Sequence, residues 1–165
     1  ALLGVSRGWG TTQFGWVLSG YLVFSTLGRI AGGYLADRVS PTRLLAFSAA
    51  MSGIFHVAFC LVSSDYGIGL FWAGGFLFDL GATTIIVLAQ QVLPDNTSTA
   101  TGMMMGFSWG TAGLFIPLVG AYAEITTVAT ALFVVSFSLF PAALLVLLLP
   151  SHHDDRHAAE PSAVS

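Results

Sequence analysis

Apolar residues along the chain gather in five long blocks, and short polar segments separate them. A helix that crosses the ~30 Å hydrocarbon layer of a bilayer needs about 20 mostly apolar residues, and each block meets that length. The blocks cover residues 14–35, 43–63, 67–93, 101–122 and 128–149. No lone short apolar segment leads into a polar domain, as it would after a signal peptide. The pattern therefore predicts an all-α fold, a polytopic bundle of five transmembrane helices.

The blocks divide the chain into three parts. Residues 1–13 are expected to be the end of a truncated helix plus an external loop, residues 14–149 the five-helix transmembrane bundle, and residues 150–165 a flexible tail. The first residue is Ala, and residues 1–5 look like the end of an earlier apolar helix. Adding that helix back gives six spans with both ends on one side of the membrane, and six-span units build many transporters. We therefore expect a fragment of a longer protein.

Composition supports this assignment. The chain is 55% hydrophobic and 8% charged, whereas soluble domains carry about 25% charged residues. Its mean hydropathy is +0.83. These values exclude an ordinary soluble domain, a disordered chain and a nucleic-acid binder. The sequence holds no nucleophile–base set, phosphate-binding loop or dinucleotide motif, so we expect no enzyme, no cofactor and no metal site.

The arginines predict the orientation. Under strict alternation of five spans, Arg38, Arg43 and Arg156 fall on one side of the membrane and Arg7 on the other. Cytoplasmic loops carry an excess of basic residues. The loop that holds Arg38 and the carboxyl-terminal tail should therefore be cytoplasmic. For the protein as a whole, we expect an integral membrane protein of the bacterial inner (plasma) membrane.

Three ionisable residues lie deep within the blocks: Arg29, His56 and Asp79. At 1.5 Å per residue, Arg29 lies ~22 Å and Asp79 ~18 Å below the outer ends of their blocks. Charges inside a bilayer are costly, and opposite charges at matched depth could pair. One interpretation is a structural ion pair. The other interpretation is a transport pathway in which Arg29 attracts an anionic group and Asp79 binds a proton or a cation. Both interpretations hold if the two residues exchange partners during transport.

The remaining deep residue, His56, has two interpretations. It lies in the middle of the second block, near Phe55 and Phe59. A lone histidine in this setting is more often hydrogen-bonded to a neighbouring helix than a proton relay.

Glycines recur at four-residue spacing on two blocks. Gly28 and Gly32 lie on the first block, and Gly102, Gly106 and Gly110 on the fourth. Stripes of small residues let helices approach closely. The functional interpretation is that these helices slide or rock against a partner domain.

A loop motif resembles a known family. Gly33, Asp37 and Arg38 match the first half of the Gly-x-x-x-Asp-Arg/Lys-x-Gly-Arg-Arg/Lys signature of the major facilitator superfamily, between the second and third helices of a six-helix half. The second half of the signature is degenerate here, because residues 40–42 read Ser-Pro-Thr and Arg43 follows just beyond. Residues 80–150 are most similar to the fosmidomycin-resistance efflux branch. The likeness rests on two runs, Val-Leu-Ala-Gln-Gln-Val-Leu-Pro at residues 87–94 and Gly-Met-Met-Met-Gly-Phe at residues 102–107. Gln91 stands where that branch has Glu.

The resemblance implies a secondary transporter of twelve helices in two halves, with this chain as helices eight to twelve. Its partners would be membrane lipid, the missing amino-terminal six-helix half, a small-molecule substrate and protons. Block three would line the central cavity, blocks one and four would lie at the interface between halves, and blocks two and five would be outer helices. Asp37 would hold the outward-open state near the amino end of block four, with Arg38 as its charged companion.

The resulting functional hypothesis is proton-coupled efflux of a small molecule or drug by alternating access. An alternative is an organic-anion, monocarboxylate-like exchanger, because the Gly28-Arg29 pair also resembles such carriers. A second alternative is a non-transporting membrane remnant or interaction subunit. The sequence does not specify the substrate.

Overall fold

The computed structural model describes residues 8–62 and 66–148, and within these ranges all regular structure is helical. The helices are α2 (Thr11–Ala36), α3 (Pro41–Leu61), α4 (Gly67–Val92), the 3₁₀ turn η1 (Pro94–Asn96), α5 (Thr97–Ile125), α6 (Val128–Phe137) and α7 (Leu139–Leu147). The all-α helix bundle is confirmed. The predicted helix end at residues 1–5 and the tail at 150–165 lie outside the described residues.

In the part of the chain that the structure describes, four helical stretches are long and apolar enough to cross a membrane: Pro41–Leu61, Gly67–Val92, Pro94–Ile125 and Val128–Leu147. They correspond to the second to fifth predicted blocks. The first block also forms a helix, α2, whose 26 residues would measure about 39 Å. It is long enough to span but less apolar than the others. Its crossing of the membrane therefore stays a prediction.

Helix boundaries follow local chemistry. α3 begins at Pro41, two residues before the predicted start, with the proline in its first turn, where its missing N–H costs no helical hydrogen bond. α5 extends beyond the predicted 101–122 at both ends. A 3₁₀ turn begins at Pro94 and leads directly into it.

The fifth block is one apolar stretch but two helices. α6 ends at Phe137 and α7 begins at Leu139, with Ser138 between them. Pro141 lacks the N–H that would bond to the carbonyl of Phe137, and a proline inside a helix also clashes with the preceding turn. The Ser138 hydroxyl donates to the carbonyl of Val135 at 2.7 Å. This proline explains the break.

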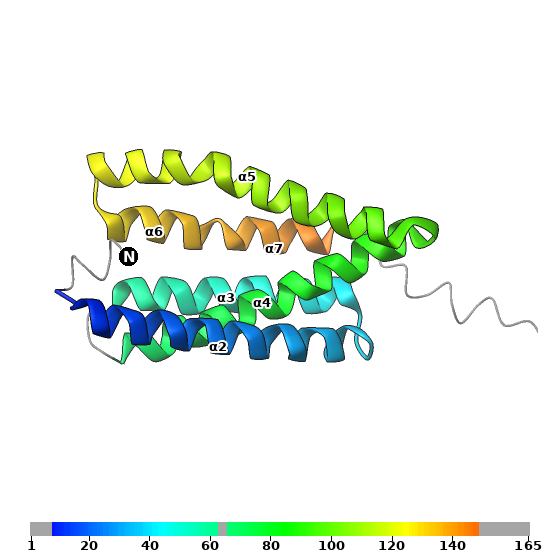
Figure 1. The fold of residues 1–165 in the computed structure, drawn as a ribbon, viewed down its shortest axis with the longest axis horizontal. Helices are drawn as coiled ribbons and strands as arrows, with labels where there is room; N and C mark the ends of the chain where they lie inside the picture. The colour runs from blue at the N-terminus through cyan, green and yellow to red at the C-terminus, as the bar shows by residue number, and fades with distance from the viewer. Residues whose placement is uncertain (1–7, 63–65, 149–165) are drawn as a thin grey trace, which may run out of the picture.

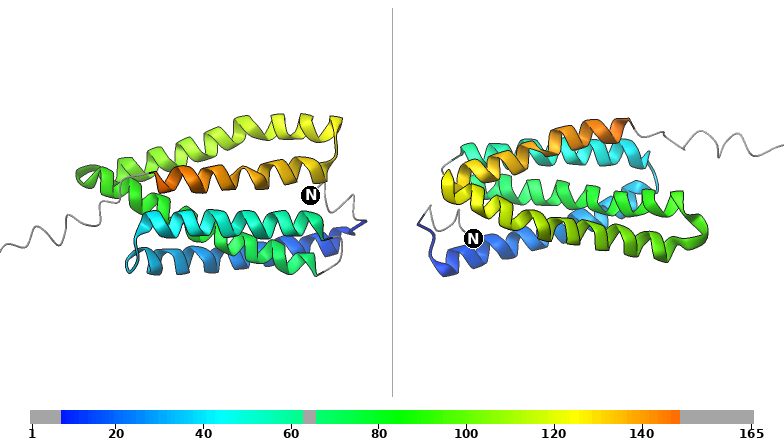
Figure 2. Two further views of the ribbon diagram at one scale, coloured as in Figure 1. Left: turned by 180° about the vertical axis from the view of Figure 1, so that it is seen from behind. Right: turned by 90° about the horizontal axis from the view of Figure 1, so that it is seen from above.

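Helix α4 is central to the described bundle, because it packs against α2, α3 and α5. α3 lies between α4 and the α6–α7 pair (Figures 1 and 2). Figure 1 also shows that α2 ends, α5 begins and α7 ends at the same end of the bundle. Arg38 and Arg43 belong to this end, as the alternation of spans predicts.

The α2–α4 interface depends on glycine. A Cβ atom at Gly28 would collide with the backbone carbonyl of Phe76, and one at Gly32 with that of Leu80. Without side chains at these positions, the two backbones approach closely, as small residues allow in membrane helices. The α2 stripe therefore packs within this chain.

The α5 stripe behaves differently. A Cβ at Gly102, Gly106 or Gly110 would meet nothing within 4 Å in the described part of the chain. Most of α5 is exposed, including Phe107 and Trp109. The identical spacing on α2 and α5 thus has two different structural outcomes.

Candidate functional site

The candidate site is an ion pair between α2 and α4. The Nε of Arg29 donates to Oδ1 of Asp79 at 2.9 Å. The matched depths of the two residues predict this pairing, and the structure brings them together. Arg29 and Asp79 form the salt bridge found among residues 8–62 and 66–148.

The two partners differ strongly in exposure. The Asp79 side chain is 8% exposed, whereas that of Arg29 is 63% exposed. A buried carboxylate depends on its partner, because an unpaired charge in a low-dielectric interior is costly. The exposed guanidinium has further N–H donors in a planar fork that fits carboxylate and phosphate groups. The pair can therefore bind a second group on its open side.

Thr83 completes the seam one turn beyond Asp79. Its hydroxyl lies 3.3 Å from the carbonyl oxygen of Arg29 and 3.3 Å from that of Asp79. Gly75, Asp79 and Thr83, which follow one another every four residues on α4, therefore all face helix α2.

Tyr21 is a site residue that the sequence analysis did not identify. Its ring packs directly over Gly75, one turn before Asp79, and stacks on Phe71 with centroids 4.6 Å apart. The available signal was its spacing, because Tyr21, Ser25 and Arg29 follow one another every four residues and so share a face of α2.

His56 occupies a separate polar cluster between α3 and α4. Its Nδ1 lies 2.8 Å from the carbonyl oxygen of Ser52, and the Ser52 hydroxyl donates to the carbonyl of Gly74 at 3.0 Å. The imidazole packs so closely over Gly74 that a Cβ there would lie 2.7 Å from it. In the described residues the imidazole therefore hydrogen-bonds within its own helix, α3, and meets the neighbouring helix α4 by packing on Gly74. The proton-relay interpretation is not tested by these contacts.

The loop-motif residues lie together at one end of the bundle but are not linked to one another. Arg38 places its guanidinium carbon 4.0 Å above the centre of the Tyr34 ring, and Asp37 is an exposed residue at the carboxyl end of α2. Within the described ranges, Asp37 forms no ion pair or side-chain hydrogen bond. In the described part of the chain, a Cβ added at Gly33 would meet only Thr83, at 3.9 Å. Arg43 is exposed on α3.

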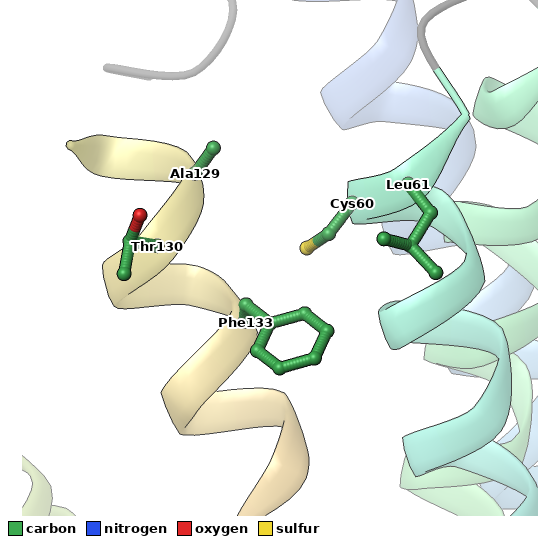
Figure 3. A pocket seen from close by; sticks show the side chains of 5 residues that line it. All are labelled: Cys60, Leu61, Ala129, Thr130 and Phe133. Carbon is green, nitrogen blue, oxygen red and sulfur yellow. The ribbon is translucent and has the colours of Figure 1, made fainter.

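A pocket of about 240 Å³ lies between the end of α3 and the start of α6, and Figure 3 shows the side chains that line it. The residues that line it are uncharged: Cys60, Leu61, Ala129, Thr130 and Phe133. It includes none of the predicted site residues. No group of three or more His, Cys, Asp or Glu suited to a metal ion occurs in the described part of the chain.

Comparison with known proteins identifies the class. The profile of the Major Facilitator Superfamily matches residues 1–164. The chain belongs to this superfamily of membrane transporters, and its members are not enzymes.

Three curated relatives refine this picture. The chain is 24% identical over 144 residues to the fosmidomycin resistance protein of Escherichia coli, covering 84% of this chain and 34% of that protein. It is 32% identical over 108 residues to the nitrite extrusion protein of Bacillus subtilis, covering 61% of this chain and 26% of that protein. It is 23% identical over 131 residues to an uncharacterized MFS-type transporter of Bacillus subtilis, covering 79% and 32%. The chain thus spans about a third or less of these relatives, and no solved structure matches it.

Proposed function

We propose that the complete protein is a proton-coupled efflux transporter that works by alternating access, and that this chain belongs to its carboxyl-terminal half. The ion pair between exposed Arg29 and buried Asp79 carries the proposal. Similarity to a fosmidomycin resistance protein and a nitrite extrusion protein supports export as the direction. A bacterial inner membrane fits these bacterial relatives, with the end that holds Arg38 on the cytoplasmic side.

In this mechanism the pair exchanges partners. When Asp79 is ionised, Arg29 neutralises it across 2.9 Å. When Asp79 takes up a proton, its charge is lost and the guanidinium is released toward the open side. Arg29 then attracts an anionic group of the substrate, and rocking of this half against the missing amino-terminal half moves the site between the two sides of the membrane.

The loop motif and the α5 stripe take supporting roles in the proposal. Asp37 and Arg38, with Gly33 and Arg43 nearby, form the cytoplasmic latch of the closed gate. Gly102, Gly106 and Gly110 form the sliding surface against the other half. Their open surroundings in the described residues leave room for that contact.

The first experiment uses the full-length parent gene in a drug-sensitive bacterial strain. Survival is measured against a phosphonate antibiotic, lipophilic cations and organic acids, each with and without a protonophore. Protonophore-sensitive resistance to one class is the expected result and identifies the substrate class. Absence of resistance, with the protein shown to be in the membrane, contradicts proton-driven efflux.

The second experiment tests Asp79 directly. Substrate-dependent proton movement is followed with a pH-sensitive dye in vesicles that contain the full-length protein, for wild type and Asp79→Asn. The control is Asp95→Asn, which makes the same chemical change at an exposed position of η1. Loss of proton movement in Asp79→Asn but not in the control is expected. Normal transport by Asp79→Asn removes this residue from the mechanism.

A second candidate function, an organic-anion exchanger, is favoured by the exposure of Arg29. A guanidinium that is 63% exposed can hold an anion without any change at Asp79. Counterflow of labelled anion in proteoliposomes with no proton gradient tests this function. Exchange that is unaffected by a protonophore but abolished by Arg29→Gln supports the exchanger, whereas a requirement for a proton gradient supports efflux. Failure of both assays for a protein that inserts normally supports a non-transporting remnant or an interaction subunit.

A further inference from the structure

A groove of about 450 Å³ lies between α3 and α7, near the end of the bundle that holds Arg38. The α3 side consists of Arg43, Ala46, Phe47 and Ala50. Their spacing of three, four and seven residues places them on one face of the helix over about two turns.

The α7 side repeats the same spacing. It consists of Phe140, Ala143, Leu144 and Leu147. Because α3 and α7 run in opposite directions (Figure 1), Leu147 lies toward the Arg43 end and Phe140 toward the Ala50 end. The two helix faces therefore line one elongated groove.

Small residues form the floor of this groove and large ones form its walls. Ala46 and Ala143 are buried, whereas Phe47, Leu144 and Leu147 are exposed. A methyl-lined floor between tall apolar walls suits a linear hydrocarbon chain. The exposed walls show that the described residues leave the groove open along its length.

One end of the groove is positively charged. Among the residues that the structure describes, Arg43 is the only charged one that lines the groove, and no carboxylate of these ranges lies within salt-bridge distance of it. Arg43 lies in the first turn of α3, where the helix dipole adds positive potential. Ser40 is the N-cap residue of α3, but its side chain makes no hydrogen bond to the helix. The backbone N–H groups of the first turn are therefore not capped by this side chain.

We infer that this groove binds an anionic phospholipid, with one acyl chain along the Ala46–Ala143 floor and the phosphate at Arg43. An apolar slot that ends in a single cation is complementary to a lipid with a charged head and an apolar tail. The positive-inside pattern places Arg43 at the cytoplasmic leaflet, where anionic lipids gather, and basic pockets between transmembrane helices on that side hold lipid head groups. Arg38, the other described arginine at this end, lies over Tyr34 and does not line the groove.

The test measures lipid retention by the purified full-length protein. Native mass spectrometry counts phosphatidylglycerol and phosphatidylcholine bound during titration with each lipid. We expect tighter binding of phosphatidylglycerol, and a loss of about tenfold in Arg43→Gln, the scale of one charge-assisted hydrogen bond. Arg38→Gln is the matched control, because it removes the same charge from the same end but outside the groove. Its affinity should stay within about twofold of wild type.

A second variant tests the groove independently of charge. Ala50→Phe places a ring inside the groove and should reduce binding of phosphatidylglycerol while Arg43 stays in place. Circular dichroism and size-exclusion profiles like those of the wild type show that the variants are folded. Equal binding of the two lipids, equal losses in Arg43→Gln and Arg38→Gln, or unchanged binding in Ala50→Phe each overturn the proposal. Absence of retained lipid also overturns it.

Discussion

Arg29 and Asp79 lie 50 residues apart in the chain and meet through a single 2.9 Å hydrogen bond from Nε to Oδ1. The contact is asymmetric, because Asp79 is buried and Arg29 is largely exposed. The carboxylate depends on the guanidinium more than the guanidinium depends on the carboxylate. Because of this asymmetry, we expect substitutions of the two residues to have different effects on the stability of the protein.

The first prediction concerns stability. Arg29→Gln leaves a buried carboxylate without its cation, whereas Asp79→Asn leaves a cation on the open side of the bundle, where water in the proposed transport cavity can solvate it. We expect Arg29→Gln to destabilise the full-length protein by about 3–5 kcal/mol, the cost of an unpaired buried charge, and Asp79→Asn by less. Thermal unfolding in detergent measures both variants.

The double variant Arg29→Gln/Asp79→Asn provides the control for this prediction. It removes both charges and should recover most of the stability that Arg29→Gln loses, since the pair acts as a unit. Equal destabilisation by the two single variants would contradict the asymmetry.

The second prediction concerns the α2–α4 seam. A methyl group at Gly28 would meet the backbone carbonyl of Phe76, and a backbone atom cannot rotate away as a flexible side chain can. Gly28→Ala should therefore force α2 and α4 apart and lower the melting temperature, with a cost of about 1–3 kcal/mol. Fluorescence-detected size exclusion after heating provides the measurement.

Gly15→Ala is the matched control on the same helix, because an added Cβ there meets nothing within 4 Å. It should be neutral or stabilising by about 0.5–1 kcal/mol through helix propensity. The seam explanation fails if the two variants behave alike.

The third prediction concerns His56. Its contacts with Ser52 and Gly74 are local and structural, so His56→Gln should leave the pH profile of transport in its wild-type position. The expected loss is in stability, because the packed imidazole and its 2.8 Å contact with the Ser52 carbonyl are removed. Transport rates across pH 5–8 measure the profile. A profile that moves or flattens in His56→Gln would restore the proton-relay interpretation.

The fourth prediction concerns the open glycine stripe of α5. If Gly106 faces the other half of the transporter, Gly106→Leu should leave the stability of the protein nearly unchanged but slow transport severalfold by obstructing the rocking motion. Exposed Leu114 on the same helix supplies the comparison, and Leu114→Val should transport normally. A large loss of stability without a specific effect on transport would instead show that the stripe only packs.

The amino-acid sequence alone predicts the helical membrane class and the order of the helices. Spans are set by local hydropathy and length, which are visible in any single sequence, so four of the five blocks correspond to apolar helices of sufficient length. It also located the ion pair, because a fixed rise per residue converts sequence position into depth. The half signature around Asp37 pointed to the superfamily, which the profile match over residues 1–164 confirms.

The face of each helix that meets a given neighbour depends on the tertiary structure. Glycines at the same spacing on α2 and α5 are indistinguishable in sequence, yet one stripe is packed and the other is open. Burial of Asp79 with exposure of Arg29 likewise depends on how α2 and α4 cross. The groove of Arg43 and Leu147 joins residues about a hundred positions apart. Such features arise from contacts between distant segments, and periodicity along one helix carries no information about the helix that packs against it.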